Sequence, residues 1–243
     1  MTRLALSAAC AVALCGCFTF RSTVSVRPDG SGTITETLAL SGPALAMMRS
    51  GEAPLSTAEA LLARAARLGQ GVALVHTDTL GGVRTTVYAF RSIAAVRYSL
   101  PDNATEPDDL AAVADVPPLY TFGFEPGAGG EPAVLRIVSP EAPDSAPTAV
   151  DSAAVSQSLD VARALVGDAR ATVEVVVEGE PAGEGAATTT LLDLPFGPLL
   201  DLVGRHPELA AGTSVPLDGV RRMLRGTEGI TVQPPGTTTV RFR

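Results

Sequence analysis

The chain has 243 residues, of which 46% are hydrophobic and 18% are charged, and its formal net charge is −8. This composition is too apolar for a disordered protein and is enough for one good-sized domain or two small ones. All 18 basic residues are arginine. The absence of lysine excludes chemistry that needs an ammonium group, such as Schiff-base catalysis or a Walker-type phosphate loop. The acidic balance also argues against a nucleic-acid partner.

The first sixteen residues have the features of a bacterial lipoprotein signal peptide. Arg3 supplies a small positive n-region, and the uncharged stretch Leu4–Leu14 is long enough for an h-region but too short to span a bilayer. A lipobox pattern follows, formed by Leu14, Cys15, Gly16 and Cys17. A small residue before the cysteine gives a peptidase access to the backbone. We therefore expect a lipidated, palmitate-bearing Cys17 as the N-terminus of the mature protein, held on a membrane by its acyl chains.

Two alternatives remain for this segment, namely an ordinary secretory signal cut nearby and an uncleaved anchor. Lipidation at Cys17 would leave no free thiol, since Cys10 and Cys15 depart with the signal. That excludes a disulfide framework, a cysteine nucleophile and a thiolate metal site. The residue after Cys17 is Phe18 and not aspartate, which favours the outer membrane over the inner membrane and leaves the periplasmic or surface side open.

After Cys17 the pattern predicts strands in adjacent pairs. Phe18–Arg27 and Thr33–Leu40 alternate apolar and polar residues around a glycine-rich turn, as in a β-hairpin. A short helix is expected at Pro43–Arg49. A longer helix is expected between a capping box at Ser56–Glu59 and a stop at Gly69, with Arg64 and Arg67 off its apolar face.

The remaining elements follow the same rule, with helices inserted between pairs of strands. The expected strands are Val72–Thr79, Val83–Phe90, Tyr98–Leu100, Leu119–Glu125, Ala133–Ser139, Ala171–Glu178, Thr188–Leu192 and a last hairpin of Ile230–Val232 with Thr237–Phe242. The expected helical segments are a turn at 90–96, Ala153–Val166, Pro195–Gly204 and Leu217–Arg225. Pro101–Pro118 is expected to be a loop.

The order of these elements predicts an α+β fold, with a mainly antiparallel sheet built of hairpins and helices packed on one face. We divide the chain into a signal peptide at 1–16, an N-terminal α+β part at 17–140, a proline-rich linker or loop at 141–150 and a C-terminal α+β part at 151–243. Whether the two α+β parts form one continuous domain is left open. Strands shared between them would decide it.

Motifs that carry chemistry are few. The segment from Asp29 to Thr35 resembles part of a calcium loop, but Arg27 and Leu38 occupy positions where an EF-hand needs carboxylates. We interpret it as a hairpin turn in which Asp29 bonds backbone amides while Gly30 and Gly32 adopt positive φ. His76 and His206 are the only histidines. We expect no metal site, no catalytic residues and no cofactor.

One basic cluster is a candidate contact for lipid headgroups. Arg221, Arg222 and Arg225 share the polar side of the expected helix Leu217–Arg225. Beside a bilayer they could contact phosphates, although an exposed helix face often carries arginines without such a role.

The N-terminal part resembles the LppM-type lipoproteins of actinobacteria. The shared features are the lipobox cysteine, a strand entering Asp29-Gly30-Ser31-Gly32-Thr33, a capped helix ending near Gly69, a hairpin with a Phe90-x-x-Ile93 turn, and a valine-rich strand running into Gly179. The resemblance implies an α/β domain on a membrane anchor, with lipid binding and no catalytic residues. This chain departs from the family in its proline- and alanine-rich insertions and in its C-terminal segment, Ile230–Arg243.

Taken together, the sequence predicts a membrane-anchored, non-enzymatic envelope lipoprotein that binds a lipid or another apolar ligand at the membrane surface. The alternative is a structural or assembly adaptor that pairs with another envelope protein through a strand edge such as Thr237–Phe242. An enzyme is the third hypothesis. A lipid binder should show an apolar cavity on the order of a few hundred Å³. An adaptor should show an unpaired strand edge or an exposed apolar patch.

Overall fold

The computed structural model describes residues 18–40, 57–100, 118–140, 159, 163, 167–182, 186–206 and 222–243. Its strands are β1 (Phe18–Val26), β2 (Gly32–Leu40), β3 (Ala73–Leu80), β4 (Val83–Phe90), β5 (Arg97–Tyr98), β6 (Tyr120–Glu125), β7 (Ala133–Ser139), β8 (Arg170–Val177), β9 (Thr188–Pro195), β10 (Thr231–Val232) and β11 (Gly236–Phe242). Its helices are α3 (Ala58–Leu68), the 3₁₀ turn η2 (Ile93–Ala95) and α6 (Phe196–Arg205).

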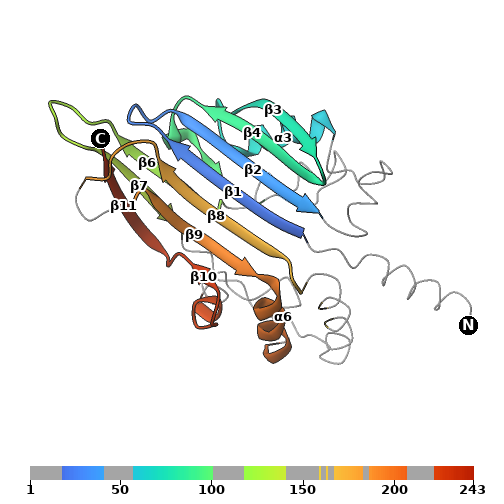
Figure 1. The fold of residues 1–243 in the computed structure, drawn as a ribbon. Coiled ribbons are helices and arrows are strands. Elements are labelled where there is room, and N and C mark those ends of the chain that lie inside the picture. The colour runs from blue at the N-terminus through green and yellow to red at the C-terminus, as the bar shows by residue number, and fades with distance from the viewer. Residues whose placement is uncertain are drawn as a thin grey trace, which may run out of the picture.

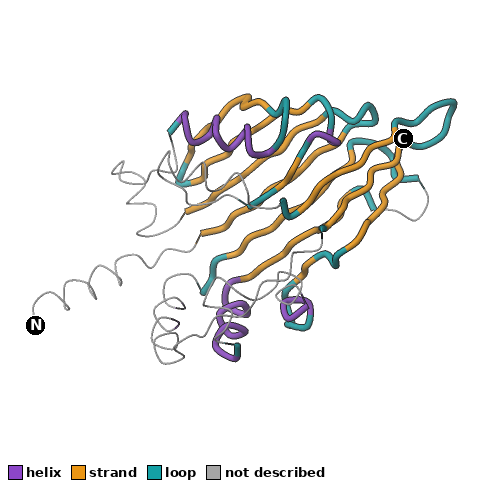
Figure 2. Tube along the Cα trace, turned by 180° about the vertical axis from the view of Figure 1, so that it is seen from behind, coloured by secondary structure: helices purple, strands orange, loops and turns teal. Residues whose placement is uncertain are grey.

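The strands form two sheets. The larger has seven strands in the order β10-β9-β8-β1-β2-β4-β3, and the smaller has four in the order β11-β7-β6-β5. Every pairing is antiparallel except that of β1 with β8. Figures 1 and 2 show the smaller sheet and α3 on the same face of the larger sheet. The fold is α+β and mainly antiparallel, as the sequence predicts.

The two faces of the larger sheet follow from the alternation of its residues. In β1 the buried positions are Phe20, Ser22, Val24 and Val26, while the residues between them are exposed or half-buried. We call the buried side, which faces α3 and the smaller sheet, the inner face. Since side chains alternate along a strand, one register shift would turn every apolar residue of β1 to solvent.

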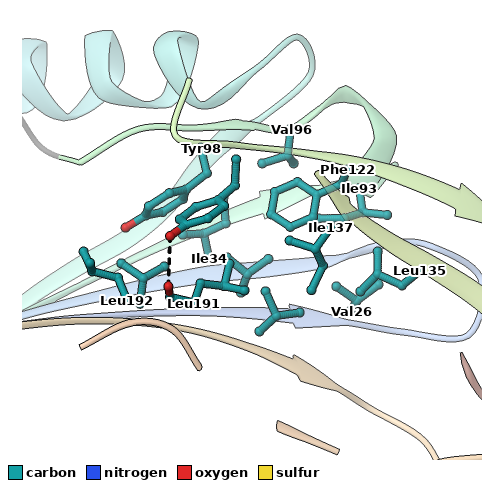
Figure 3. Packing of buried hydrophobic residues seen from close by; sticks show 14 of the residues in the cluster. Val26, Ile34, Ile93, Val96, Tyr98, Phe122, Leu135, Ile137, Leu191 and Leu192 are labelled. Atoms are coloured by element: carbon teal, nitrogen blue, oxygen red, sulfur yellow. Dashed lines mark hydrogen bonds between the residues drawn. The ribbon is translucent and has the colours of Figure 1, made fainter. Parts of the chain in front are cut away.

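The hydrophobic core fills the space between the two sheets (Figure 3). Val26 and Ile34 from the larger sheet and Ile93, Leu135 and Ile137 from the other side are at most 1% exposed. The Tyr120 hydroxyl also crosses from one sheet to the other, donating to the Leu191 carbonyl oxygen at 3.0 Å. The buried phenol thereby has the partner that a polar group needs away from water.

Strands from both parts of the chain share both sheets. β8 lies beside β1 in the larger sheet, and β11 lies beside β7 in the smaller one. The expected hairpin of Ile230–Val232 with Thr237–Phe242 is therefore wrong, although both segments contain strands. β10 pairs with β9 and β11 pairs with β7, because the intervening Pro234-Pro235 lacks the N–H groups that a hairpin ladder needs and the chain crosses there between sheets.

Helix α3 confirms the expected helix but changes two of its details. Its N-cap is Thr57, whose Oγ1 accepts from the Ala60 amide at 3.1 Å, and its C-cap is Gly69 as expected. A capping box that begins one residue earlier, at Ser56, is therefore wrong. Arg64 is 4% exposed and buried with Leu61 and Leu68, so its expected place off the packed face is also wrong. A buried acceptor holds it there, as described below.

The structure contains the other expected strands, the turn within 90–96 and the helix expected at Pro195–Gly204, most of them within a residue or two of the expected bounds. Two strands differ more: β5 ends before Leu100, and β9 extends to Pro195. Some expected elements lie wholly or mostly outside the described residues. These are the signal peptide, the helix Pro43–Arg49, the loop Pro101–Pro118, the linker 141–150, most of Ala153–Val166 and the first part of Leu217–Arg225. Among the described helices, none is long and apolar enough to cross a membrane.

Candidate functional site

The most informative part of the surface is the end of the larger sheet where β1 begins. Phe18 lies opposite Leu40, the last residue of β2, and the Leu40 amide donates to the Gly82 carbonyl oxygen at 2.9 Å. β8 also begins at this end, and β9 ends there before α6. We call it the Phe18 end. Cys17, the expected lipidation site, directly precedes Phe18 in the sequence, and Phe18 begins a central strand of the sheet.

Apolar side chains gather on the inner face of the Phe18 end. One row crosses four adjacent strands, because Phe20 lies opposite Leu38 on one side and Ala171 on the other, and Ala171 lies opposite Leu194. Nearer the end of the sheet, the Phe18 ring meets the Phe196 ring edge to face, with centroids 5.3 Å apart. The set Phe18, Phe20, Leu38, Leu40, Leu194 and Phe196 is called the inner apolar patch. All of its members except Phe20 are half-buried.

A polar cluster lies one row deeper. Glu36 Oε1 accepts from Arg64 Nη2 at 2.6 Å and from Arg64 Nε at 3.2 Å, and both residues are buried. Arg64 also donates to the Ser99 carbonyl oxygen at 2.6 Å and lies over the Tyr98 ring, 5.8 Å from its centroid. Burial alone lowers the pKa of Arg64, but the charge of Glu36 and its hydrogen bond outweigh burial, and the pKa is raised. The guanidinium is thus fully charged.

Three fully buried hydroxyl groups lie around this ion pair, those of Ser22, Tyr88 and Tyr98. The Tyr88 hydroxyl has no hydrogen-bond partner among the described residues. Burial, and secondarily the charge of Glu36, raises the pKa of both phenols. On β1 and β2 the cluster lies between the inner apolar patch and the hydrophobic core, whereas Leu194 of the patch packs directly against the core. An apolar ligand entering from the Phe18 end would therefore meet polar groups on β1 and β2 and apolar side chains on β9.

The predicted site residues have different outcomes. Leu14, Cys15, Gly16, Cys17 and Arg221 lie outside the described residues. Arg222 and Arg225 are exposed on a helical turn that leads into β10. β10 begins opposite Asp193, near the end of β9, so this turn lies toward the Phe18 end. Their contact with lipid headgroups stays a prediction.

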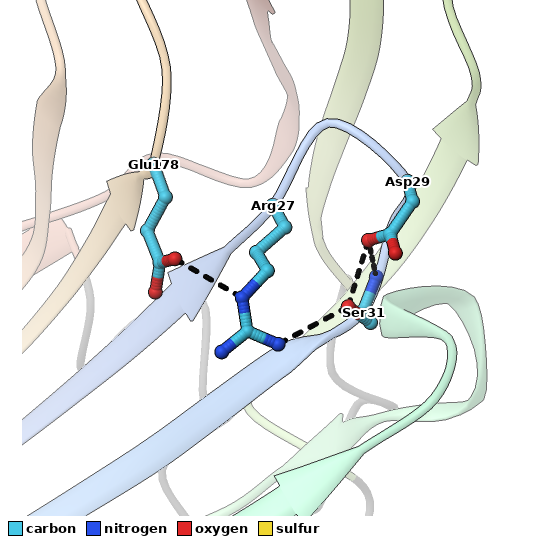
Figure 4. Close-up of polar contacts among 4 residues, drawn as sticks. All are labelled: Arg27, Asp29, Ser31 and Glu178. Carbon is cyan, nitrogen blue, oxygen red and sulfur yellow. Dashed lines mark hydrogen bonds and ion pairs between the residues drawn. The ribbon is translucent and has the colours of Figure 1, made fainter.

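The glycine-rich turn between β1 and β2 is a hairpin turn, as interpreted (Figure 4). Asp29 Oδ1 accepts from the Ser31 amide at 2.9 Å and from the Ser31 hydroxyl at 2.7 Å, and these bonds lower the pKa of Asp29. Arg27 donates to Ser31 Oγ and to Glu178 Oε2. Gly30 has the expected positive φ of 80°, but the same expectation for Gly32 is wrong. The turn connects two strands, whereas an EF-hand loop connects two helices, so the segment is not an EF-hand.

The structure does not bring the two histidines together. His76 is exposed on β3, one edge of the larger sheet, whereas His206 caps α6, which follows β9 near the opposite edge. Within the described ranges, no three His, Cys, Asp or Glu side chains are grouped in a way that could hold a metal ion.

The free edge of β11, the basis of the adaptor hypothesis, is partly occupied. Glu180 and Arg243 exchange backbone hydrogen bonds at 2.9 and 3.0 Å, and the Ala182 amide donates to the Arg241 carbonyl oxygen at 2.8 Å. Farther along, a cavity of about 390 Å³ lies beside β11, and its lining comprises Ala182, Ala186, Thr189, Thr238, Thr239, Val240 and Arg241. Because polar and apolar side chains contribute about equally to this lining, the cavity is not the purely apolar one expected of a lipid binder.

Sequence reasoning missed Glu36 and Arg64, although their positions carried a signal. Glu36 lies between Ile34 and Leu38 on the buried side of β2. Arg64 lies three residues after Leu61 and four before Leu68, on the packed side of α3. An acid and a base on two buried faces that pack together predict an ion pair, because a buried charge needs a partner.

Comparisons with known proteins give little more. No protein-family model matches the chain, and no curated protein matches it. A search of solved structures finds the folded domain of LppM from Mycobacterium tuberculosis, determined by NMR, with 11% sequence identity and a TM-score of 0.28. The match covers 93% of this chain and 89% of that one. The chain therefore has a weak resemblance to LppM, too distant to establish a shared fold or function.

Proposed function

We propose that this protein is a bacterial envelope lipoprotein, anchored through Cys17, that binds the acyl part of a lipid at the Phe18 end of the sandwich without catalysing a reaction. The observation that carries the proposal is the position of the inner apolar patch. It includes Phe18, which directly follows Cys17 in the sequence, and five of its six members are half-buried.

The physical argument concerns where lipid would be available. A lipidated Cys17 lies at the membrane surface, and Phe18 follows it by one residue, about 3.3 Å of extended chain. Each methylene moved from water to an apolar surface contributes about 0.8 kcal/mol. The row Leu194, Ala171, Phe20 and Leu38 spans roughly 15 Å, given about 4.8 Å between strands. Its central members, Phe20 and Ala171, are buried, so an acyl chain would contact mainly the half-buried Leu38 and Leu194 at the two ends of the row.

The test begins with anchoring. Cells fed labelled palmitate should label the wild-type protein and leave a Cys17→Ala variant unlabelled. Equal labelling of the two proteins would contradict the proposed anchor.

Lipid binding is then measured by native mass spectrometry of the mature lipoprotein extracted in detergent, where covalent acyl chains and bound lipid differ in mass. We expect a stoichiometric bound lipid that is lost in Leu38→Ser/Leu40→Ser and retained in Leu62→Ser/Val75→Ser. The control pair replaces one leucine and one valine that are 57% and 58% exposed elsewhere on the surface. A wild-type protein that carries no lipid and ignores added envelope lipids would contradict lipid binding.

The adaptor hypothesis is the second candidate. It is favoured by the portion of β11 before Arg241, beside which no other described strand lies except β7. A protein free of lipid in the experiment above, together with a strand of another envelope protein cross-linked to Thr237 or Thr239, would support it over lipid binding.

A further inference from the structure

The most exposed large apolar side chains of the described chain include two that flank one turn. Leu80 ends β3 and is 79% exposed, and Val83 begins β4 and is 39% exposed. Only Gly81 and Gly82 separate them, and the five residues from Thr79 to Val83 carry no charge. We call Leu80–Val83 the hairpin tip. Such exposure of a leucine needs an explanation when it adjoins a second exposed apolar residue.

The hairpin tip lies at the Phe18 end. Thr19 lies opposite Ala39, Ala39 lies opposite Val83, and Val83 lies opposite Leu80. Leu80 is therefore level with Thr19, two residues and about 7 Å along the strand from Cys17. β3 is three strands from β1, which is roughly 15 Å. Figure 1 shows the tip at the same end of the sheet as the start of β1.

We infer that the hairpin tip is a second membrane contact, in which Leu80 and Val83 enter the interfacial region of the bilayer that holds the lipid anchor. This inference rests on the anchoring in the proposed function but not on lipid binding at the inner apolar patch. The two sets of residues also lie on opposite faces, since Val83 alternates with the inward-facing Arg84 and Thr86.

The bilayer is the occupant that the geometry favours. The headgroup layer of one leaflet is about 5–8 Å thick, so an anchor one residue before β1 keeps the entire Phe18 end within reach of it. A partner protein would have to compete with the membrane for that position. Because the hairpin tip carries no charge, it would bind the membrane through its apolar side chains alone. Its insertion would therefore require neither anionic lipid nor low salt.

A second contact would fix the orientation of the domain. With the anchor on β1 and the tip on β3 and β4, the strands stand on the membrane instead of lying along it. The turn at Pro28–Ser31 and the C-terminus then point away from the bilayer, because both lie at the far end of the sheet (Figure 1). The nine residues of β1 place that end about 30 Å from the surface.

The experiment uses the absence of tryptophan from the chain. A Leu80→Trp variant carries one tryptophan at the tip, and a Val75→Trp variant carries one on the same strand at a position that is 58% exposed in the native protein. Each full-length, lipidated variant is reconstituted into phosphatidylcholine vesicles that contain lipid brominated near the headgroup. We expect a blue-shifted, strongly quenched emission from L80W, unchanged by high salt, and a solvent-like, unquenched emission from V75W.

Two results would overturn the inference. Unquenched emission from both variants would mean that the tip stays in water, and equal quenching of both would mean that β3 lies along the membrane. The mass of the N-terminal peptide is measured on the same samples. An unmodified Cys17 would contradict the anchor itself, whereas a lipidated Cys17 with unquenched L80W would contradict only the hairpin tip.

Discussion

Arg64 and Glu36 form a buried ion pair that joins α3 to β2, with Nη2 and Oε1 2.6 Å apart and the two side chains only 5% and 10% exposed. Twenty-eight residues separate them in the chain. All three nitrogens of the guanidinium donate hydrogen bonds to Glu36 or Ser99, so its donors are largely satisfied without water. The pair therefore fixes where α3 lies on the inner face, beside the smaller sheet.

Removing one partner of this pair should destabilise the protein strongly. Arg64→Ala leaves the Glu36 carboxylate buried and uncompensated, a loss of about 3–5 kcal/mol in the free energy of unfolding. Urea denaturation measures it. Arg136→Ala is the matched control, because Arg136 and Glu125 are 43% and 57% exposed, and it should cost less than about 1 kcal/mol. Similar losses for both variants would show that the buried pair has no special role.

The buried phenols predict an alkaline limit to stability. Burial raises the pKa of Tyr88 and Tyr98 above the usual value near 10. Above that pH the unfolded chain loses phenolic protons that the folded protein keeps, so the free energy of unfolding falls as pH rises. We expect the two tyrosines to ionise only as the protein unfolds. One alkaline titration measures both events, with ultraviolet absorbance reporting phenol ionisation and circular dichroism reporting unfolding.

Substitution of one phenol checks the cause of this alkaline limit. Tyr98→Phe should shift the alkaline transition to higher pH, since one fewer proton is lost on unfolding. If both phenols ionise well before the circular dichroism changes, the explanation fails.

The surface carboxylate of Asp193 predicts a loss of stability at acidic pH. A hydrogen bond from Arg170 lowers the pKa of Asp193 against a smaller opposing effect of burial. A carboxylate with a lowered pKa contributes stability that is present above its unfolded value of about 3.8 and is lost as pH falls through its folded value. Asp193→Asn should therefore lower the urea midpoint at pH 7 and lower it by less at pH 3, where the unfolded carboxyl group is already mostly protonated. An equal decrease at both pH values would point to lost packing instead.

The sequence predicts local elements well because their signals are local. Alternation defines β1 and β2, and Gly69 ends α3. The pairing of distant strands has no such signal. Nothing in β8 or β11 indicates that they lie beside β1 and β7, since an alternating strand pairs equally well with any neighbour of matching face. The same holds for the candidate site. The inner apolar patch combines residues from β1, β2, β9 and α6, and only the three-dimensional register shows that they are adjacent.

Gly32 is required for a steric reason that its sequence context does not indicate. The turn motif suggests that Gly32 needs positive φ, but the structure gives that conformation to Gly30 alone in this turn. A methyl group on Gly32 would instead overlap the Ser25 carbonyl oxygen and approach the Phe90 ring to 2.7 Å. The Ser25 carbonyl oxygen belongs to the backbone, and Ser25 pairs with Thr33 in the β1–β2 ladder. It therefore cannot move aside without breaking that ladder.

Gly32→Ala should therefore lower the free energy of unfolding by about 1–3 kcal/mol or more, as overpacking does. Gly123→Ala in β6 is the matched control, because its methyl group would meet only Arg136 Cβ at 3.6 Å, an ordinary contact. It should change stability by less than about 0.5 kcal/mol, or increase it slightly by restricting the unfolded chain. Urea denaturation of the two variants distinguishes a steric requirement at Gly32 from a general intolerance of substitution in these strands, for which the two losses would be equal.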